Sequence, residues 1–564
     1  MQLTFATGMS AMTKSSASHI SRRVQTAALL FTVVVAALLS LHGLNNNAFW
    51  DDEANTAIFA RNWLRTGTLT AFDGVNVVGF RQGAELNGKL ENVYMPPVQY
   101  YVAGLGLRLF GSGTVGGRLP FVFAGLLAIG VLALFVKWHL RGDVPLWVAT
   151  ALVALCPAYL LFIRQCRYYS IVVLLTLTVL VSFVRDKSHR GSRIVSVLVA
   201  AVAAWLLMFT NYLNAAALAC CLPLFFTLRR YRNLTNVCLV SGVYVILLAA
   251  GFYVLRTANP LAISVSYKDT ITGFHRLWRL FYWHLSGLPR FEFFPLVAPI
   301  LVLWLSSHSR SDRIASLLRE TLFLCAVMVV YSATIAALSP QTVTESTTLA
   351  DMRYSVSLVP IGAVATACAL CALWHSSPMS GPIGSLVAAA MLVATNAFSS
   401  ALGGWAPLRS TLYEYIRENA HDYVTGNEAV IGFLKRLPKG RVIRVIPDFM
   451  TYPAMFYAPA QHYCCQLPDD FTGKTPTSVR LPDYVFNSRV LPDYILVGAD
   501  VDPEQLLGQC TAAFGPGRYR LLPEVGTDYR DHSRPEIPWH SFGPVAGKRR
   551  RGFTVLERTG LRAN

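Results

Sequence analysis

The chain contains eleven long apolar runs, and this feature restricts its fold more than any other. A helix of about 20 apolar residues crosses the hydrocarbon core of a bilayer. Only 14% of the 564 residues are charged, whereas soluble domains carry roughly 25%. The sequence therefore predicts a polytopic α-helical membrane protein of about 11 spans. The runs lie at 24–42, 119–138, 145–163, 168–184, 194–210, 213–228, 236–255, 291–306, 320–338, 354–374 and 382–402.

Basic residues predict which ends of the spans face the cytoplasm, because short loops rich in Lys and Arg remain inside. The basic clusters fall in alternate loops, around Lys137 and Arg141, 185–193, 229–232 and 310–319. The first run is long and is followed by no cleavage site, so we expect a retained span with a cytoplasmic N-terminus. The C-terminal part then lies in the periplasm of a bacterial inner membrane.

The formal net charge is +18, but this charge does not indicate nucleic acid as a partner. Most Lys and Arg residues sit in short loops between apolar runs, which is the pattern that membrane lipids impose. The expected partners are therefore membrane lipids and lipid-borne molecules, and we expect no nucleic acid.

Two long loops and the C-terminal part form the predicted outer surface. The first loop, residues 43–117, contains two predicted interfacial helices, at 54–65 and 97–110. After residue 403 the pattern changes to short β runs that alternate with helical ones. We predict a transmembrane domain over 1–402 and a periplasmic α/β domain over 403–564. Its elements include a helix at 428–435 and strands at 441–446 and 494–497.

Three adjacent acidic residues, Asp51, Asp52 and Glu53, follow the end of the first run. Carboxylates at a bilayer surface are costly and typically functional. Helix capping is the alternative, with Asp51 as the N-cap and Glu53 as a first-turn acid. Three acids exceed what a cap needs, so we interpret the group as the source of a general base.

Arginines form a second candidate group. Arg164 and Arg167 lie between two spans with almost no loop, and Arg353 stands at the start of another span. Counting the spans from a cytoplasmic N-terminus places all three arginines on the outer side, whereas most basic residues of the loops lie on the inner side. Guanidinium groups bind phosphate bidentately, although snorkelling to lipid headgroups is an alternative. Transfer from a lipid phosphate needs both a base for the acceptor hydroxyl and positive charge for the departing phosphate.

Several short motifs occur in a characteristic order around these residues. They are the acids after the first span, Tyr94-Met95-Pro96-Pro97-Val98-Gln99-Tyr100-Tyr101, Leu109-Phe110-Gly111, Gly117-Arg118-Leu119-Pro120, Cys156-Pro157 before Arg164 and Arg167, Arg353-Tyr354, and Arg534-Pro-Glu-Ile-Pro-Trp-His-Ser-Phe542. In this order the chain resembles the GT-C membrane glycosyltransferases. The branch that it resembles contains bacterial relatives of protein O-mannosyltransferases and the lipid A aminoarabinose transferase.

The resemblance implies a glycosyltransferase that moves a sugar from a polyprenyl-phosphate donor to a lipid, glycan or protein acceptor, with inversion. Asp52 matches the catalytic carboxylate, and Asp51 or Glu53 would orient the acceptor. Relatives in the aminoarabinose branch have Lys where this chain has Met95. The donor phosphate must therefore find its cation elsewhere, with Lys89, Arg81, Arg164, Arg167 and Arg353 as candidates. Candidates for substrate contacts are Tyr94, Tyr354, Asn211 and Tyr212.

The sequence indicates no cofactor, and its cysteines lack metal-ligand spacing. The acids suit either metal-free base catalysis or binding of a divalent cation. A disulfide from Cys510 to Cys464 or Cys465 is a further possibility in an oxidising compartment. The main alternative function is a transporter or flippase for a lipid-linked anionic solute. Transporters, however, place polar groups near the bilayer midplane, and here these groups gather at one face.

Overall fold

The computed structural model describes most of the 564 residues. The described residues are 8–79, 86–92, 95–185, 190–228, 234–258, 273–288, 311–339, 341, 343, 351–396, 408–420, 425–446, 450–464, 479–485, 490–498, 502–522, 534–535, 540, 542 and 553–560.

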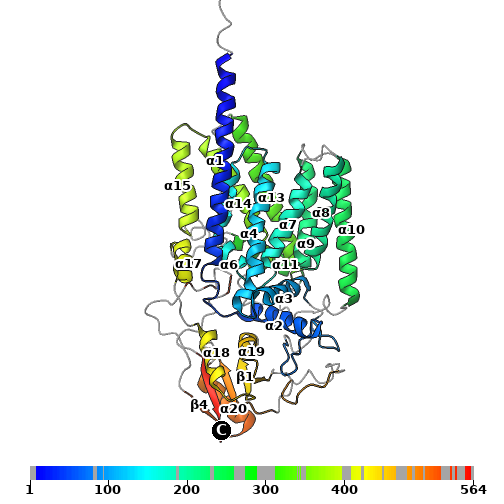
Figure 1. Ribbon diagram of the computed structural model, residues 1–564, viewed down its shortest axis with the longest axis vertical. Coiled ribbons are helices and arrows are strands. Elements are labelled where there is room, and N and C mark those ends of the chain that lie inside the picture. Colours follow the sequence, from blue (N-terminus) through cyan, green and yellow to red (C-terminus); the bar gives the residue numbers. More distant parts are fainter. Residues whose placement is uncertain are drawn as a thin grey trace, which may run out of the picture.

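Apolar helices stand side by side as a bundle (Figure 1). They are α1 (Gly8–Leu41), α4 (Thr114–His139), α5 (Leu146–Ala154), α6 (Pro157–Ile163), α7 (Tyr169–Val184), α8 (Arg190–Met208), α9 (Tyr212–Cys221) with η2 (Leu222–Thr227), α10 (Leu234–Ala258), α13 (Asp312–Leu338), α14 (Leu358–Trp374) and α15 (Ser380–Ala394). Each predicted run except 291–306 overlaps one of these helices or helix pairs, and residues 397–402 of the run 382–402 lie outside the described residues. The run 291–306 lies outside the described residues.

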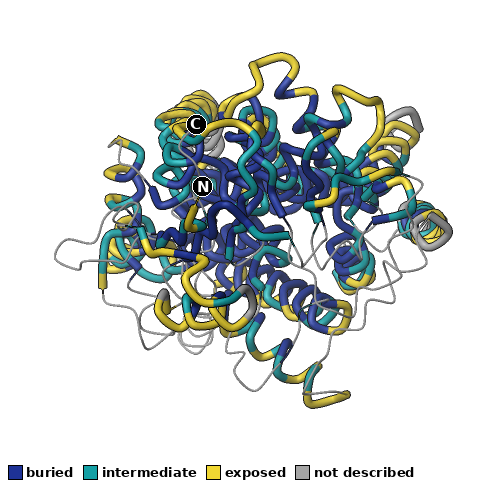
Figure 2. Tube along the Cα trace, turned by 90° about the horizontal axis from the view of Figure 1, so that it is seen from below, coloured by how far each residue is buried: buried dark blue, intermediate teal, exposed yellow. Residues whose placement is uncertain are grey.

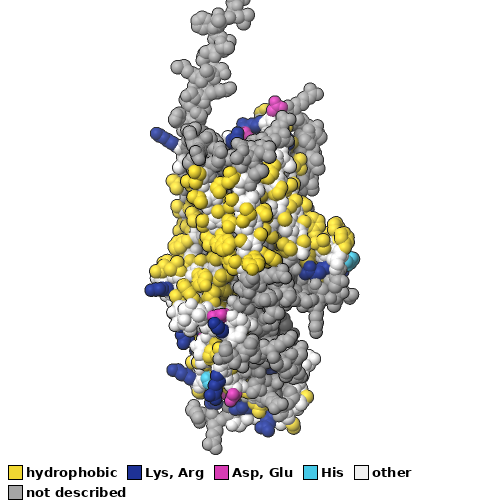
Figure 3. Space-filling model, turned by 90° about the vertical axis from the view of Figure 1, so that its right-hand side faces the viewer, with side chains coloured by type: hydrophobic (Ala, Val, Ile, Leu, Met, Phe, Trp, Pro, Cys, Tyr) yellow, Lys and Arg dark blue, Asp and Glu magenta, His cyan; other side chains and the backbone are white. Residues whose placement is uncertain are grey.

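Three of the described helices are long and apolar enough to cross a membrane alone, namely α1, α4 and α13. A fourth span is formed if α5 and α6, which meet at 69°, are taken together. Hydrophobic side chains cover the middle of the face shown in Figure 3, and Lys and Arg side chains lie mostly toward its two ends. Such an apolar surface suits lipid rather than water. Seen from below, the buried residues concentrate in the centre of the molecule (Figure 2).

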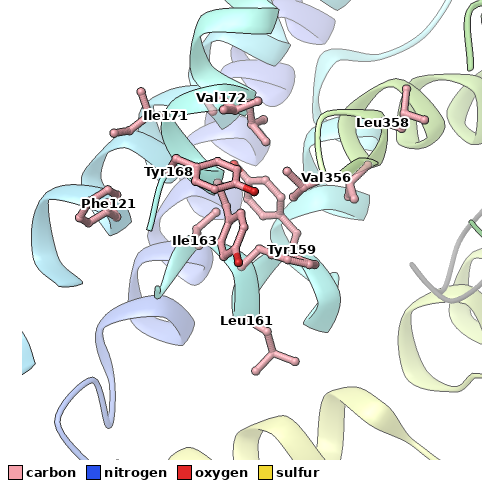
Figure 4. Close-up of a cluster of buried hydrophobic side chains, with 14 of the residues drawn as sticks. Phe121, Tyr159, Leu161, Ile163, Tyr168, Ile171, Val172, Val356 and Leu358 are labelled. Atoms are coloured by element: carbon pink, nitrogen blue, oxygen red, sulfur yellow. The ribbon is translucent and has the colours of Figure 1, made fainter. Parts of the chain in front are cut away.

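The core joins the turn between α6 and α7 to the segment that precedes α14. Phe121, Tyr159, Tyr168 and Val356 meet in one cluster of buried side chains (Figure 4). The Tyr159 hydroxyl donates to the Gly125 carbonyl at 2.7 Å, so its polar end is satisfied within this apolar cluster. Close packing of this kind holds the segments that it joins at fixed relative positions. It fixes the two segments that carry Arg167 and Arg353.

Two helices lie across the lower end of the bundle (Figure 1): α2 (Asp51–Thr66) and α3 (Val98–Phe110). Both predicted interfacial helices are therefore present as helices. The first begins three residues earlier than expected, which places all three acids in its first turn. Trp50 occupies the N-cap position, so the alternative in which Asp51 is the cap is wrong.

The C-terminal part contains a five-stranded sheet with the order β2-β1-β3-β5-β4. Strands β1, β2 and β3 run parallel, and β5 pairs antiparallel with both β3 and β4. The predicted helix at 428–435 and the strands at 441–446 and 494–497 are all found. The elements are α18 (Gly426–Arg436), β1 (Val442–Ile446), α19 (Thr451–Tyr457), β2 (His462–Tyr463), β3 (Tyr494–Val497), α20 (Pro503–Phe514), β4 (Tyr519–Leu521) and β5 (Thr554–Arg558).

Two further helices border this arrangement, α11 (Gly273–Gly287) and α17 (Thr411–Ala420). Helix α17 contacts α6 and α15 of the bundle, and the sheet begins only after it. Cys464 and Cys510 are both free thiols, so they form no bridge with each other. Cys465 lies outside the described residues.

Candidate active site

Asp52 lies between two arginines that come from different parts of the chain. Its Oδ1 is 3.1 Å from Nη2 of Arg167, and its Oδ2 is 2.6 Å from Nη1 of Arg353. The Asp52 side chain is 22% exposed, so a substrate can reach it. The predicted base and two of the five predicted phosphate-binding cations thus meet at one point.

Arg353 is presented by a short 3-10 turn, η5 (Met352–Ser355), directly before α14. Asp351 caps this turn, and its Oδ2 accepts from Nε of Arg353 at 2.5 Å. Burial alone would lower the pKa of the Arg353 guanidinium, but Asp351 first, and then Tyr354 and Asp52, raise it well above its usual value. Tyr354 lies beside the same guanidinium, whose carbon is 5.5 Å from the ring centre. Arg353 is therefore a fixed positive charge.

Arg167 comes from the turn between α6 and α7 and is almost fully buried. Its Nη1 donates to the Thr56 hydroxyl at 2.9 Å, while Nη2 holds Asp52. Thr56 lies one helical turn after Asp52 on α2, so one guanidinium spans both positions. Three elements, α2, the α6–α7 turn and η5, thus converge on the Asp52 carboxylate.

Glu53 points away from this site and holds the scaffold together. Its oxygens accept from Nε and Nη2 of Arg118 at 2.8 and 2.6 Å, and Oε1 also accepts from the Cys166 backbone at 2.7 Å. The Glu53 side chain has no exposed area. Consecutive residues of a helix point about 100° apart, which explains why Asp52 and Glu53 face different partners. Both carboxylate oxygens of Glu53 are therefore engaged by partners inside the protein.

Arg164 is also occupied elsewhere. Its guanidinium donates to the carbonyl oxygens of Leu39, His42 and Gly43 at 3.2, 2.7 and 2.7 Å, and to the Tyr415 hydroxyl at 3.3 Å. These groups belong to the end of α1 and to α17. The structure therefore places Arg164 where it fastens helix ends, while Arg167 of the same turn faces Asp52.

Asp51 is half-buried beside Asp52, and its Oδ1 accepts from the Asp52 backbone N–H at 2.8 Å. Burial and then the Asp52 charge raise the pKa of Asp51 to about 7. Arg534 and Arg353 act in the opposite direction and favour the ionised form. The Asp51 carboxyl group therefore exchanges its proton near neutral pH, well above the usual range of an aspartate.

The remaining predicted site residues are more scattered. Lys89 is exposed at a turn that precedes Leu90. Asn211 caps α9, because its side chain accepts from the Asn214 N–H at 3.1 Å, and Tyr212 begins that helix half-buried. Arg81 and Tyr94 lie outside the described residues. No group of three or more His, Cys, Asp or Glu side chains that could hold a metal ion occurs in the described segments.

Three contributors were not assigned a role from the sequence. Thr56 and Asp351 position the two arginines. Arg534, in the motif near the C-terminus, lies with its guanidinium carbon 6.0 Å from the centre of the Trp50 ring. Thr56 follows Asp52 by four residues, a spacing that places both side chains on one face of a helix, so the sequence contained a signal for its role. The contact of Arg534 with Trp50 joins distant segments and has no local signature.

No family model matches the sequence, and no curated protein matches it. Solved structures do match. One is ArnT from Cupriavidus metallidurans bound to undecaprenyl phosphate, with a TM-score of 0.56 and 16% identity over 94% of this chain and 98% of that one. The apo state of the same protein matches with a TM-score of 0.52 and 15% identity, over 96% and 98% of the two chains. Nearly the whole chain therefore shares the fold of ArnT, in agreement with the fold that the resemblance to the GT-C membrane glycosyltransferases predicted.

Proposed function

We propose that this protein is an inverting glycosyltransferase that takes a sugar from a polyprenyl-phosphate donor. The observation that carries the proposal is the pairing of Asp52 with both Arg167 and Arg353. A partly exposed carboxylate held by two fixed guanidinium groups provides a base and a phosphate site in one place. The likeness of fold to a protein whose structure holds undecaprenyl phosphate supports this class of donor.

The proposed reaction is a single displacement at the anomeric carbon. The hydroxyl oxygen of the acceptor attacks that carbon while Asp52 takes the hydroxyl proton, and Asp51 orients the acceptor. The bond between the carbon and the phosphate oxygen breaks, and the polyprenyl phosphate leaves with the electron pair. Arg167 and Arg353 neutralise the charge that develops on the phosphate. In the structure these same arginines pair with Asp52.

The site belongs on the periplasmic side of the membrane. Helix α1 leads down to α2 at the lower end of the bundle (Figure 1). Asp52 lies in the first turn of α2, and its ion pairs place Arg167 and Arg353 at the same end. Basic residues such as Lys137, Arg141, Arg185 and Arg313 lie at the opposite ends of their helices. By the positive-inside rule that opposite end is cytoplasmic. A periplasmic site would receive a donor that has already crossed the bilayer.

The acceptor can be a lipid, a glycan or a protein, and lipid A modification and mannosyl transfer are both compatible with the site. Mass spectrometry of membrane lipids and cell-surface glycans, with and without the gene, tests the proposal and identifies sugar and acceptor together. We expect one product to lose the mass of one sugar on deletion and to regain it on complementation. Unchanged products would contradict the proposal.

The transporter alternative makes a different prediction. A flippase would move intact undecaprenyl phosphate or its sugar derivative across a vesicle bilayer without breaking the bond between sugar and phosphate. Movement of intact lipid by purified protein, with no sugar released or transferred, would favour that alternative.

A further inference from the structure

Helix α11 has one buried face and one exposed face. Its buried residues recur at intervals of four and three, a spacing that places them on one side of a helix: Leu280, His284 and Gly287. The other side carries exposed aromatic residues: Phe274, Trp278 and Tyr282. Aromatic side chains of this kind suit the boundary between lipid and water, and α11 lies at the lower end of the bundle (Figure 1). The helix therefore directs His284 into the protein.

The buried face of α11 packs against η5, the turn that presents Arg353. Nδ1 of His284 lies 3.1 Å from the Ser355 hydroxyl oxygen, and both residues are fully buried. Gly287 faces Met352, where an added Cβ would lie 2.5 Å from the sulfur atom. Met352 and Ser355 are the first and last residues of η5. Helix α11 thus contacts the turn on both sides of Arg353.

A second connection runs from α11 to the residue that caps the same turn. Nη2 of Arg276 donates to the carbonyl oxygens of Ser339 and Gln341 at 2.8 and 2.9 Å. The side-chain oxygen of Gln341 accepts from the Asp351 N–H at 2.7 Å. Asp351 in turn accepts from Nε of Arg353 at 2.5 Å. A series of hydrogen bonds therefore leads from α11 to the Arg353 guanidinium.

We infer that α11 positions Arg353 for the donor phosphate, and that His284 is a positioning residue of the proposed reaction. This inference rests on the proposed function, because that function assigns Arg353 to the phosphate. A short 3-10 turn has poorer internal hydrogen bonds than an α-helix, so contacts with its neighbours fix its direction. Electrostatic stabilisation requires a cation that is held in place in advance. Loss of the contact between His284 and Ser355 should therefore weaken phosphate binding through Arg353.

The two nitrogens of the His284 ring differ in their surroundings, and this difference makes the inference specific. Nδ1 lies beside the Ser355 hydroxyl, whereas Nε2 has no hydrogen-bond partner among the described residues. An Asn side chain carries its amide at the level of Nδ1, and the longer Gln side chain carries it at the level of Nε2. Asn in place of His284 should therefore keep the contact with Ser355, and Gln should lose it.

The test is the binding of undecaprenyl phosphate to the full chain in lipid nanodiscs. We expect His284→Ala and His284→Gln to weaken binding by about 3- to 10-fold, as the loss of one buried hydrogen bond implies. His284→Asn should remain within about twofold of the wild type. His275→Ala is the matched control, because His275 is exposed on the same helix, and it should bind as the wild type does.

A double variant tests whether His284 acts through Arg353. In the Arg353→Gln background, His284→Ala should cause no further loss of affinity, because the group that it positions is already gone. A merely structural role of His284 would instead lower affinity by the same factor in both backgrounds. Such equal losses would overturn the inference.

Two further results would also overturn the inference. One is a His284→Ala protein that binds undecaprenyl phosphate as tightly as the wild type does. The other is rescue by Gln in place of Asn, and this comparison still decides if His284→Ala fails to fold. The proposed function is tested separately by the wild-type protein. Its failure to bind undecaprenyl phosphate would refute the donor class, and the inference with it.

Discussion

Arg167 and Arg353 reach opposite oxygens of one carboxylate, although 186 residues separate them in the chain. Each is fixed by a second acceptor, Thr56 for Arg167 and Asp351 for Arg353. These contacts hold both guanidinium groups in place, and preorganised positive charge is the condition for strong electrostatic stabilisation in an active site. Their common target is the reason why we assign them, rather than Arg164 or Lys89, to the donor phosphate.

This assignment predicts different effects for different arginines. Arg353→Gln and Arg167→Gln should each weaken binding of undecaprenyl phosphate by about 10-fold or more, because charge-assisted hydrogen bonds contribute about 1.5–3 kcal/mol. Lys89→Gln and Arg65→Gln should bind nearly as wild type does, since both side chains are exposed. Equilibrium binding in nanodiscs measures all four variants. Equal losses of affinity in all four variants would contradict the assignment, because they would show that any lost positive charge weakens binding, whatever its position.

At the scale of elements, α2 is positioned by close contacts that only small residues permit. Gly104 of α3 faces the Trp63 ring of α2, where an added Cβ would lie 2.7 Å from a ring carbon. Gly106 faces α4, where an added Cβ would lie 2.3 Å from the Gly116 carbonyl oxygen and 2.4 Å from a Pro120 ring carbon. Glycines inside this apolar helix therefore serve packing.

A substitution at this contact tests the packing directly. Gly106→Ala should lower the free energy of unfolding by about 1–3 kcal/mol, because an overpacked contact forces the helices apart. Gly130→Ala in α4 is the control, since no described atom lies within 4 Å of its added Cβ. Thermal unfolding in detergent compares the two variants. Equal stability would mean that α3 and α4 do not approach so closely.

The positions of most helices could be predicted from the sequence, because an apolar run long enough to span is a strong local signal. The roles within the acidic trio could not. Asp52 and Glu53 are neighbours in sequence, but side chains of consecutive helical residues point about 100° apart. Asp52 therefore faces Arg167 and Arg353, whereas Glu53 faces Arg118. Arg164 and Arg167 separate in the same way around a tight turn. Such directions depend on the start of α2 at Asp51, which lies three residues before the predicted start.

At the scale of the whole molecule, the C-terminal sheet and its helices lie beneath α2, and α19 touches α2 directly (Figure 1). Nη1 of Arg61 on α2 donates to the Phe456 carbonyl oxygen at 3.0 Å. Asn76 donates to the Gln461 carbonyl oxygen at 2.9 Å and accepts from the Tyr463 N–H at 2.8 Å. These contacts join segments that are far apart in the sequence, so no local sequence pattern predicts them.

Tyr457 tests whether this docking supports the site. Its hydroxyl accepts from the Phe49 N–H at 3.0 Å and lies 2.6 Å from the Thr114 hydroxyl, so it connects α19 to the segment before α2 and to the first residue of α4. Tyr457→Phe should lower the free energy of unfolding by about 1–2 kcal/mol, since a backbone donor loses its partner. Tyr413→Phe is the control, because Tyr413 is 62% exposed. An unaffected Tyr457→Phe protein would indicate that the domain is not docked in this way.

The most direct test of the account replaces the carboxylate at its centre. Asp52→Asn keeps the size and polarity of the side chain but removes the charge that two arginines hold. When this variant is returned to a deletion strain, mass spectrometry should find a normal amount of membrane protein and at least about a hundredfold loss of the sugar-bearing product, as expected for a lost general base. Asp312→Asn, at the start of α13, should restore the product fully. Near wild-type product from Asp52→Asn would contradict the account.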